Sequence, residues 1–291
     1  MHSREPGAIW SHAMEQLPPR NELDREYSPS SVAPQYLSIL RSYGIRSASA
    51  RERHPHDADV RYGPEPAETL SFFPPARRPA PVHVFVHGGH WQESSKEDSC
   101  FAAPAFLRAG AGFVALGYGL APRRTLGDMV RSVRRGIRWI ADHAGDLGIR
   151  PDGVYLSGSS AGAHLVAAAV ASDGVDLAPI AGITLLSGVY DLEPVRHSYV
   201  NDLVGMTPAD VRAYSPIRHL PLRAPRILVA RAAAETSEYG RQQAEFVRAV
   251  RRGGQQCDNR VFADRNHFDL PLDLADPATP LGREVLAQMQ L

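Results

Sequence analysis

The sequence predicts an α/β fold in which helices cover both faces of a central, mostly parallel sheet. Short apolar runs alternate with helical stretches of ten or more residues, a pattern typical of βαβ units. Runs such as Val82–Val86 and Ile180–Leu186 are almost continuously apolar, as expected for strands buried on both faces. The composition, 43% hydrophobic and 22% charged over 291 residues, is that of a globular chain long enough for one large core.

Residues 1–58 are expected to form a lead-in to this fold. One short helix is predicted near Ala8–Gln16 and a second over Pro34–Ser42. Asp59–Tyr62 and Thr69–Phe73 alternate loosely between apolar and polar residues, with glycine and proline between them. This arrangement predicts a hairpin with a long connecting loop.

The remaining elements follow in alternation along the chain. In Met129–His143 the apolar residues fall largely on one helical face. The predicted strands are Val82–Val86, Gly112–Leu116, Val154–Leu156, Ile180–Leu186, Arg226–Ala230 and Asn259–Ala263, and the predicted helices are Met129–His143, Ala161–Ala171, Ser237–Arg251 and Leu281–Gln290. Residues 192–222 lack strand patterning, so we expect a small cap or insertion there within a single domain, residues 1–291.

The charge balance and the cysteines argue against several classes of protein. Because 32 basic and 32 acidic residues cancel, a nucleic-acid-binding surface is not expected. No apolar run approaches the ~20 residues of a membrane span, and the first residues lack the apolar core of a signal peptide. Cys100 and Cys257 lie far apart, which favours free thiols. We therefore expect a cytoplasmic protein with a small-molecule substrate, with a homodimer left open.

The strongest chemical signal is the segment Gly158-Ser159-Ser160-Ala161-Gly162, which fits G-x-S-x-G. It lies between a predicted strand and a predicted helix, the context that this motif requires. Small residues allow the sharp turn that would hold Ser160 at a helix N-terminus, where free N–H groups favour developing negative charge. Ser160 is therefore the candidate nucleophile, and the alternative is an ordinary Gly/Ser turn.

Two further segments would supply the oxyanion hole and the general base of a serine hydrolase. His87-Gly88-Gly89-His90-Trp91 follows a strand, and its glycines could direct N–H groups at a substrate oxygen. With the N–H of Ala161, Gly88 and Gly89 would form an oxyanion hole. His267 follows the last strand, where the chain order Ser…acid…His places the general base.

Two glutamates compete for the role of the acid. Glu235 lies in the loop that follows the predicted strand Arg226–Ala230, and its carboxylate could hold the imidazole of His267 in one tautomer. Glu238 is the alternative. A carboxylate in the first turn of a helix can also be explained by its favourable interaction with the helix dipole.

The chain resembles the α/β-hydrolase superfamily and, within it, the arylformamidase branch, from about Tyr62 to Leu291. The lead-in residues 26–30 are also similar to that branch. The segments that carry the resemblance are His87-Gly88-Gly89-His90-Trp91, Tyr118-Gly119-Leu120-Ala121-Pro122, Gly158-Ser159-Ser160-Ala161-Gly162-Ala163-His164, Ser187-Gly188-Val189-Tyr190-Asp191-Leu192 and Asn266-His267-Phe268. The resemblance implies Ser160 as nucleophile, His267 as base and Gly88, Gly89 and Ala161 as oxyanion donors. The chain departs from the family pattern at Glu235, where the family usually has Asp.

These observations predict an enzyme that hydrolyses an aryl formamide through an acyl-enzyme, without metal or organic cofactor. The side chains expected to contact the substrate are His90, Trp91, Tyr118, Tyr190 and Phe268. A carboxylesterase for small esters is the alternative, and a non-catalytic binding protein of the same fold is a further one. The His-rich stretch 54–59 and the pair His83 and His87 lack the partners of a metal site.

Overall fold

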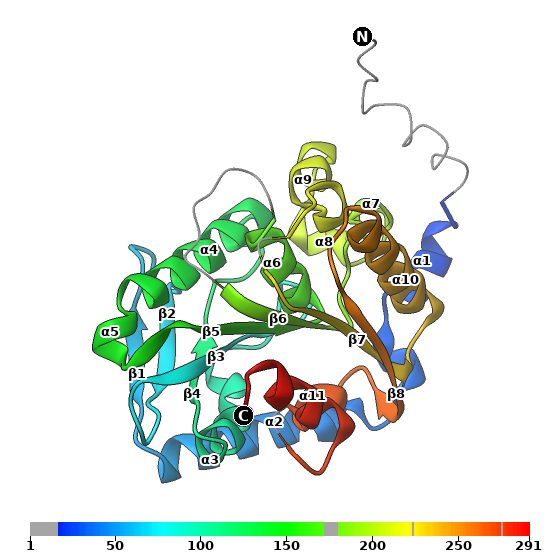
Figure 1. Ribbon diagram of the computed structural model, residues 1–291. Helices are drawn as coiled ribbons and strands as arrows, with labels where there is room; N and C mark the ends of the chain where they lie inside the picture. Colours follow the sequence, from blue (N-terminus) through cyan, green and yellow to red (C-terminus); the bar gives the residue numbers. More distant parts are fainter. Residues whose placement is uncertain (1–16, 172–179, 223, 275) are drawn as a thin grey trace.

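The computed structural model describes residues 17–171, 180–222, 224–274 and 276–291. The predicted helix Ala8–Gln16 lies outside the described residues. An eight-stranded sheet with helices on both faces confirms the predicted fold class (Figure 1). The strands are β1 Asp57–Arg61, β2 Thr69–Phe73, β3 Ala80–Val86, β4 Gly112–Leu116, β5 Ile149–Ser159, β6 Ile180–Leu186, β7 Ile227–Ala234 and β8 Asp258–Asn266.

The strand order is β1-β2-β4-β3-β5-β6-β7-β8. The strand β2 runs antiparallel to β1 and to β4, whereas every pairing from β4 through β8 is parallel. The predicted hairpin is thus confirmed as the β1–β2 pair at one edge. Because parallel strands end at the same edge of a sheet, residues that follow β3, β5, β7 and β8 gather on one side of the molecule.

Helices form a layer on each face of the sheet. In the view of Figure 1, α4, α6 and α10 lie above the sheet, and α2, α3 and α11 lie below it. The helices are α1 Arg20–Glu26, α2 Tyr36–Arg53, α3 Ala103–Arg108, α4 Leu126–Asp142, α5 Ala144–Leu147, α6 Ala161–Ala169, α7 Glu193–Arg196, α8 Asn201–Val204, α9 Pro208–Tyr214, α10 Ser237–Arg252 and α11 Pro280–Gln288, with 3-10 turns η2 Pro29–Val32, η3 Glu97–Ala102, η4 Pro216–Arg218 and η5 Leu270–Asp273. No helix among them is long and apolar enough to cross a membrane.

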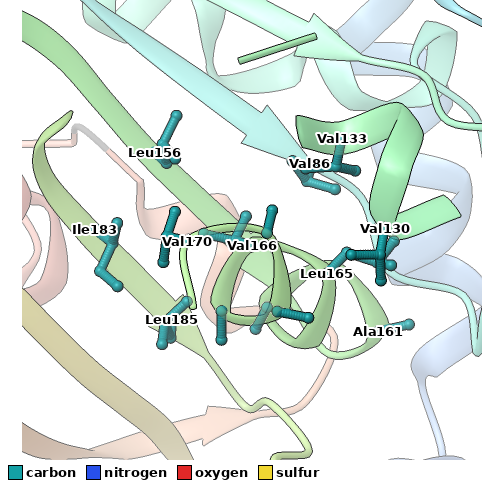
Figure 2. Close-up of a cluster of buried hydrophobic side chains, with 14 of the residues drawn as sticks. Val86, Val130, Val133, Leu156, Ala161, Leu165, Val166, Val170, Ile183 and Leu185 are labelled. Atoms are coloured by element: carbon teal, nitrogen blue, oxygen red, sulfur yellow. The ribbon is translucent and has the colours of Figure 1, made fainter. Parts of the chain in front are cut away.

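The helix α6 lies at the centre of the larger core, and all nine of its residues are buried. Its side chains pack between the sheet and α4, as Figure 2 shows for Leu165 beside Val130. Each such aliphatic side chain stabilises the fold by about 1.5–3 kcal/mol when buried. This packing fixes the N-terminus of α6 against the end of β5.

Several elements extend beyond the ranges predicted from the sequence. The helix predicted over Pro34–Ser42 runs from Tyr36 to Arg53, and its buried residues are only Ser47 and Ala50. Since most of α2 faces outward, its apolar residues do not form the stripe by which an amphipathic helix is recognised. Residues 192–222 contain α7, α8, α9 and η4, which are too short for a helical period to be detected.

Candidate active site

The backbone around Ser160 is folded into a strained turn between β5 and α6. Ser160 has φ 55° and ψ −119°, an uncommon conformation for a non-glycine residue, which costs about 1–3 kcal/mol. Its N–H donates a 2.8 Å hydrogen bond to the carbonyl of Leu186. A Cβ atom on Gly158 would lie 2.3 Å from the backbone of Gly162, so only glycine fits there. The turn leaves the N–H of Ala161 at the start of α6 without a partner within the helix.

The loop after β3 lies directly against this turn. Gly89, His90 and Trp91 have φ values of 98°, 49° and 62°, three successive left-handed residues. A Cβ atom on Gly88 would lie 2.7 Å from the carbonyl oxygen of Ser159 and 3.2 Å from Cβ of Ser160. In the described part of the chain, the N–H groups of Gly88 and Gly89 donate to no protein acceptor. Their N–H groups therefore remain available beside Ser160.

The ends of β7 and β8 bring His267 and Glu235 together. Nδ1 of His267 lies 2.9 Å from Oε1 of Glu235, and the two side chains are 5% and 0% exposed. The other candidate acid, Glu238, points elsewhere: it accepts a hydrogen bond from the hydroxyl of Tyr27 and forms an ion pair with Arg241. The geometry thus favours Glu235 over Glu238 as the partner of the imidazole.

Ser160, His267, Gly88 and Gly89 all line one cavity of about 500 Å³. The described residues show no hydrogen bond between Oγ of Ser160 and the imidazole of His267. Such bonds are often long before substrate binds. The full lining is Pro29, Ser30, Tyr36, Leu37, Leu40, Tyr43, Phe85, His87, Gly88, Gly89, His90, Glu93, Ser94, Asp98, Ser99, Ser159, Ser160, Tyr199, His267 and Phe268.

Two aromatic rings hold the imidazole of His267 in place. The ring centroid of Tyr239 lies 4.6 Å from it and that of Phe268 lies 5.3 Å from it. Burial raises the pKa of Tyr239 well above its usual range, so its hydroxyl stays protonated. The sequence offers no signal for Tyr239, because the contact depends on how α10 packs beside β8.

The five predicted substrate contacts divide into two groups. His90 and Phe268 line the cavity. Trp91, Tyr118 and Tyr190 do not, and all three are at most 1% exposed, which corrects the prediction that they stack on a substrate. These three lie in motifs next to the site, but their rings turn into the core. Their ring partners are His164 at 5.2 Å for Trp91, His87 at 4.4 Å for Tyr118 and Phe246 at 3.9 Å for Tyr190.

Three buried histidines are held in the neutral form. Desolvation lowers the pKa of His83 to about 3 and that of His87 and His164 to about 4. His83 stacks on Phe106 with centroids 4.1 Å apart and is a buried core residue. Nδ1 of His87 lies 2.9 Å from the carbonyl oxygen of Gly88 and so supports the glycine loop. Within the described ranges, no group of three side chains could hold a metal ion.

The outer side of the cavity comes from residues that the motifs do not include. Tyr36, Leu37, Leu40 and Tyr43 lie on α2, and Tyr199 lies between α7 and α8. The similarity of residues 26–30 to the arylformamidase branch is the one sequence signal that the lead-in matters here. The contacts themselves depend on packing between segments more than 100 residues apart in the sequence.

Comparison with known proteins agrees with this arrangement. The sequence model of the BD-FAE family matches residues 71–237. Kynurenine formamidase of Danio rerio is 33% identical over 273 residues, covering 88% of this chain and 92% of that protein. Kynurenine formamidase of Salmo salar is 29% identical over 287 residues, covering 93% and 96%.

More distant relatives and structures are esterases. An esterase of Mycobacterium tuberculosis is 28% identical over 242 residues, covering 73% of this chain and 57% of that protein. A proposed thioesterase from Silicibacter sp. superposes with a TM-score of 0.79 at 23% identity, covering 93% of this chain and 99% of that one. That likeness concerns the fold alone. The chain therefore belongs to the BD-FAE family and to the kynurenine formamidase family of α/β-hydrolases, and it is a hydrolase.

Proposed function

We propose that this hydrolase cleaves aryl formamides such as N-formyl-kynurenine, releasing formate and an arylamine. The observation that carries the proposal is the hydrogen bond from His267 to Glu235 in a cavity that also contains Ser160. The kynurenine formamidase relatives, which align over nearly the whole chain, support a formamide as the substrate.

In the acylation step, Oγ of Ser160 attacks the formyl carbon while Nε2 of His267 takes its proton. The carbonyl oxygen becomes an oxyanion that accepts hydrogen bonds from the N–H groups of Gly88, Gly89 and Ala161. The carboxylate of Glu235 stabilises the imidazolium. The C–N bond then breaks as His267 gives the proton to the nitrogen, and the arylamine leaves.

In the deacylation step, His267 takes a proton from a water molecule that attacks the formyl-serine. The same N–H groups hold the second oxyanion, and collapse of this intermediate releases formate and returns the proton to Ser160. The aromatic side chains that line the cavity, Tyr36, Tyr43, Phe85, Tyr199 and Phe268, suit an aryl leaving group.

A panel of formamides and esters tests this proposal, with Ser160→Ala as the blank. We expect release of formate from N-formyl-kynurenine by the parent enzyme alone. A carboxylesterase is the second candidate, because the same groups cleave esters and an esterase relative aligns with most of this chain. Fast hydrolysis of small aliphatic esters without turnover of formamides would favour it over the formamidase.

The binding-protein alternative has a separate test. A fluorophosphonate reacts with an activated serine, so we expect labelling of the parent protein and none of Ser160→Ala. An unlabelled parent protein would revive this alternative. A cytoplasmic location and a homodimer remain proposals, and the two buried free cysteines, Cys100 and Cys257, support a reducing compartment.

A further inference from the structure

The carboxylate of Glu235 has few contacts of its own that could fix its position. Its Oε1 atom lies 2.9 Å from Nδ1 of His267, whereas its Oε2 atom is buried without a hydrogen-bond partner among the described residues. The three residues before it, Ala232, Ala233 and Ala234, carry no side-chain donor that could orient it. The position of this carboxylate therefore depends on the backbone on either side of Glu235.

The backbone before Glu235 belongs to the sheet, whereas the backbone after it does not. Ala234, the last residue of β7, pairs with Asn266 of β8. Thr236 precedes the first turn of α10, and its side chain forms no capping hydrogen bond with that helix. A helix start without its own cap leaves backbone N–H groups free. The turn that carries Glu235 can therefore be held by a group from elsewhere in the chain.

Glu26, the last residue of α1, supplies this group. Its Oε2 atom accepts a 3.0 Å hydrogen bond from the N–H of Glu238 and a 2.8 Å hydrogen bond from the hydroxyl of Ser237. The hydroxyl of Thr236 donates to the carbonyl oxygen of Glu26. Glu26 thus contacts each of the three residues that follow Glu235.

Helix electrostatics explain why a carboxylate occupies this place. At the C-terminus of α1 a negative side chain is unfavourable, because the helix dipole places partial negative charge there. At the N-terminus of α10 the same side chain is favourable, and it accepts a hydrogen bond in the way that a capping residue does. The position of Glu26 therefore benefits α10 and the turn before it, and not α1.

The next residue, Tyr27, adds two contacts with the same helix. It is 1% exposed, and its hydroxyl donates a 2.6 Å hydrogen bond to Oε2 of Glu238. The same hydroxyl accepts a 3.0 Å hydrogen bond from Nε2 of Gln242. Because both partners lie on α10, the end of α1 is fixed against the first two turns of α10.

We propose that Glu26 is a positioning residue of the triad, which fixes the turn after β7 so that Glu235 stays aligned with His267. This inference rests on the proposed function, because it concerns the same triad. Glu26 does not line the cavity, so its effect is on the chemical step and not on substrate binding.

Substitutions in α1 test the inference. Glu26→Ala removes the carboxylate, and we expect kcat for N-formyl-kynurenine to fall about 10-fold with KM unchanged, because reacting groups become misaligned. Glu26→Gln keeps an oxygen that can accept the same hydrogen bonds, so its kcat should stay within about threefold of the parent value. Glu22→Ala is the matched control, because it removes an exposed glutamate from the same helix, and it should keep the parental kcat. A parental kcat in Glu26→Ala would overturn the inference.

A double-mutant cycle separates positioning from a general effect on the fold. In Glu235→Ala no carboxylate remains to be aligned, so the further change Glu26→Ala should lower kcat by about twofold or less. A side chain that only stabilised the fold would lower kcat by the same factor in both backgrounds. That result would also overturn the inference.

The rate at which a fluorophosphonate labels Ser160 is a readout that does not depend on the substrate. This rate should fall about 10-fold in Glu26→Ala and stay unchanged in Glu22→Ala. If the parent enzyme is labelled but releases no formate from N-formyl-kynurenine, the proposed function fails, and labelling still tests the role of Glu26. If formate is released but Glu26→Ala is labelled at the parental rate, only the role of Glu26 is overturned. An unlabelled parent protein would overturn both proposals.

Discussion

The floor and the outer wall of the cavity are built in different ways. We call Gly88, Gly89, Ser160 and His267 the floor, because each follows the end of a strand of the parallel part of the sheet. We call Tyr36, Leu37, Leu40, Tyr43 and Tyr199 the wall, which stands on α2 and on the helices after β6. Leu37 and Leu40 are 62% and 40% exposed. From this difference we propose that the floor performs the chemistry, while the wall contacts the substrate.

The largest effect on kcat is expected from substitution of Glu235, the acid that lies beside His267. Glu235→Gln removes the charge that stabilises the imidazolium and alters the tautomer of His267, so kcat should fall about 10⁴-fold. Glu238→Gln is the control and should reduce kcat only a few-fold, because Glu238 pairs with Tyr27 and Arg241. Steady-state formate release measures both variants. Equal losses would contradict the assignment of Glu235.

A smaller loss is expected at the oxyanion loop. In Gly88→Ala the new Cβ atom would lie 2.7 Å from the carbonyl of Ser159, so the loop must shift and its N–H group moves. We expect kcat to fall about 10²–10³-fold, as when one oxyanion donor is lost. Gly145→Ala, where the added atom meets nothing within 4 Å, should keep the parental kcat. Retained activity in Gly88→Ala would place the oxyanion elsewhere.

Low pH should reduce the free energy of unfolding, because three buried histidines are neutral in the folded protein. His83, His87 and His164 have a folded-state pKa of about 3, 4 and 4, whereas their ordinary value is 6.5. Below pH 6.5 the unfolded chain therefore binds protons that the folded chain does not, and stability decreases as the pH falls. At pH 5 each histidine costs about 2 kcal/mol relative to pH 7. Urea unfolding at the two pH values measures this; an unchanged free energy of unfolding would contradict it.

The smallest effect is expected at the wall. Leu37→Ala and Leu40→Ala remove part of the apolar surface that faces the substrate, and each should raise KM about threefold with little change in kcat. Ile45→Ala, on the same helix but outside the lining, is the control for a general effect on α2. A large fall in kcat with unchanged KM would show that the wall takes part in the chemistry.

The same comparison explains what could be predicted from the sequence. Ser160 and Gly88 occupy conformations or close contacts that restrict the residue type, so short motifs reveal them. The choice of Glu235 over Glu238 required the structure, because the sequence does not show at which residue the Ala-rich strand β7 ends. Trp91, Tyr118 and Tyr190 share the motifs, but the direction of a side chain is decided by packing. The wall residues on α2 could not be predicted from the sequence, because this helix buries only Ser47 and Ala50 and so lacks an apolar stripe.

Formate release from N-formyl-kynurenine by the parent enzyme and by Ser160→Ala tests the central claim most directly. We predict steady release by the parent enzyme and a decrease of about 10⁵–10⁶-fold in Ser160→Ala, because removal of the nucleophile leaves only binding and the oxyanion donors. Formate release by Ser160→Ala at a rate close to that of the parent enzyme would contradict the account.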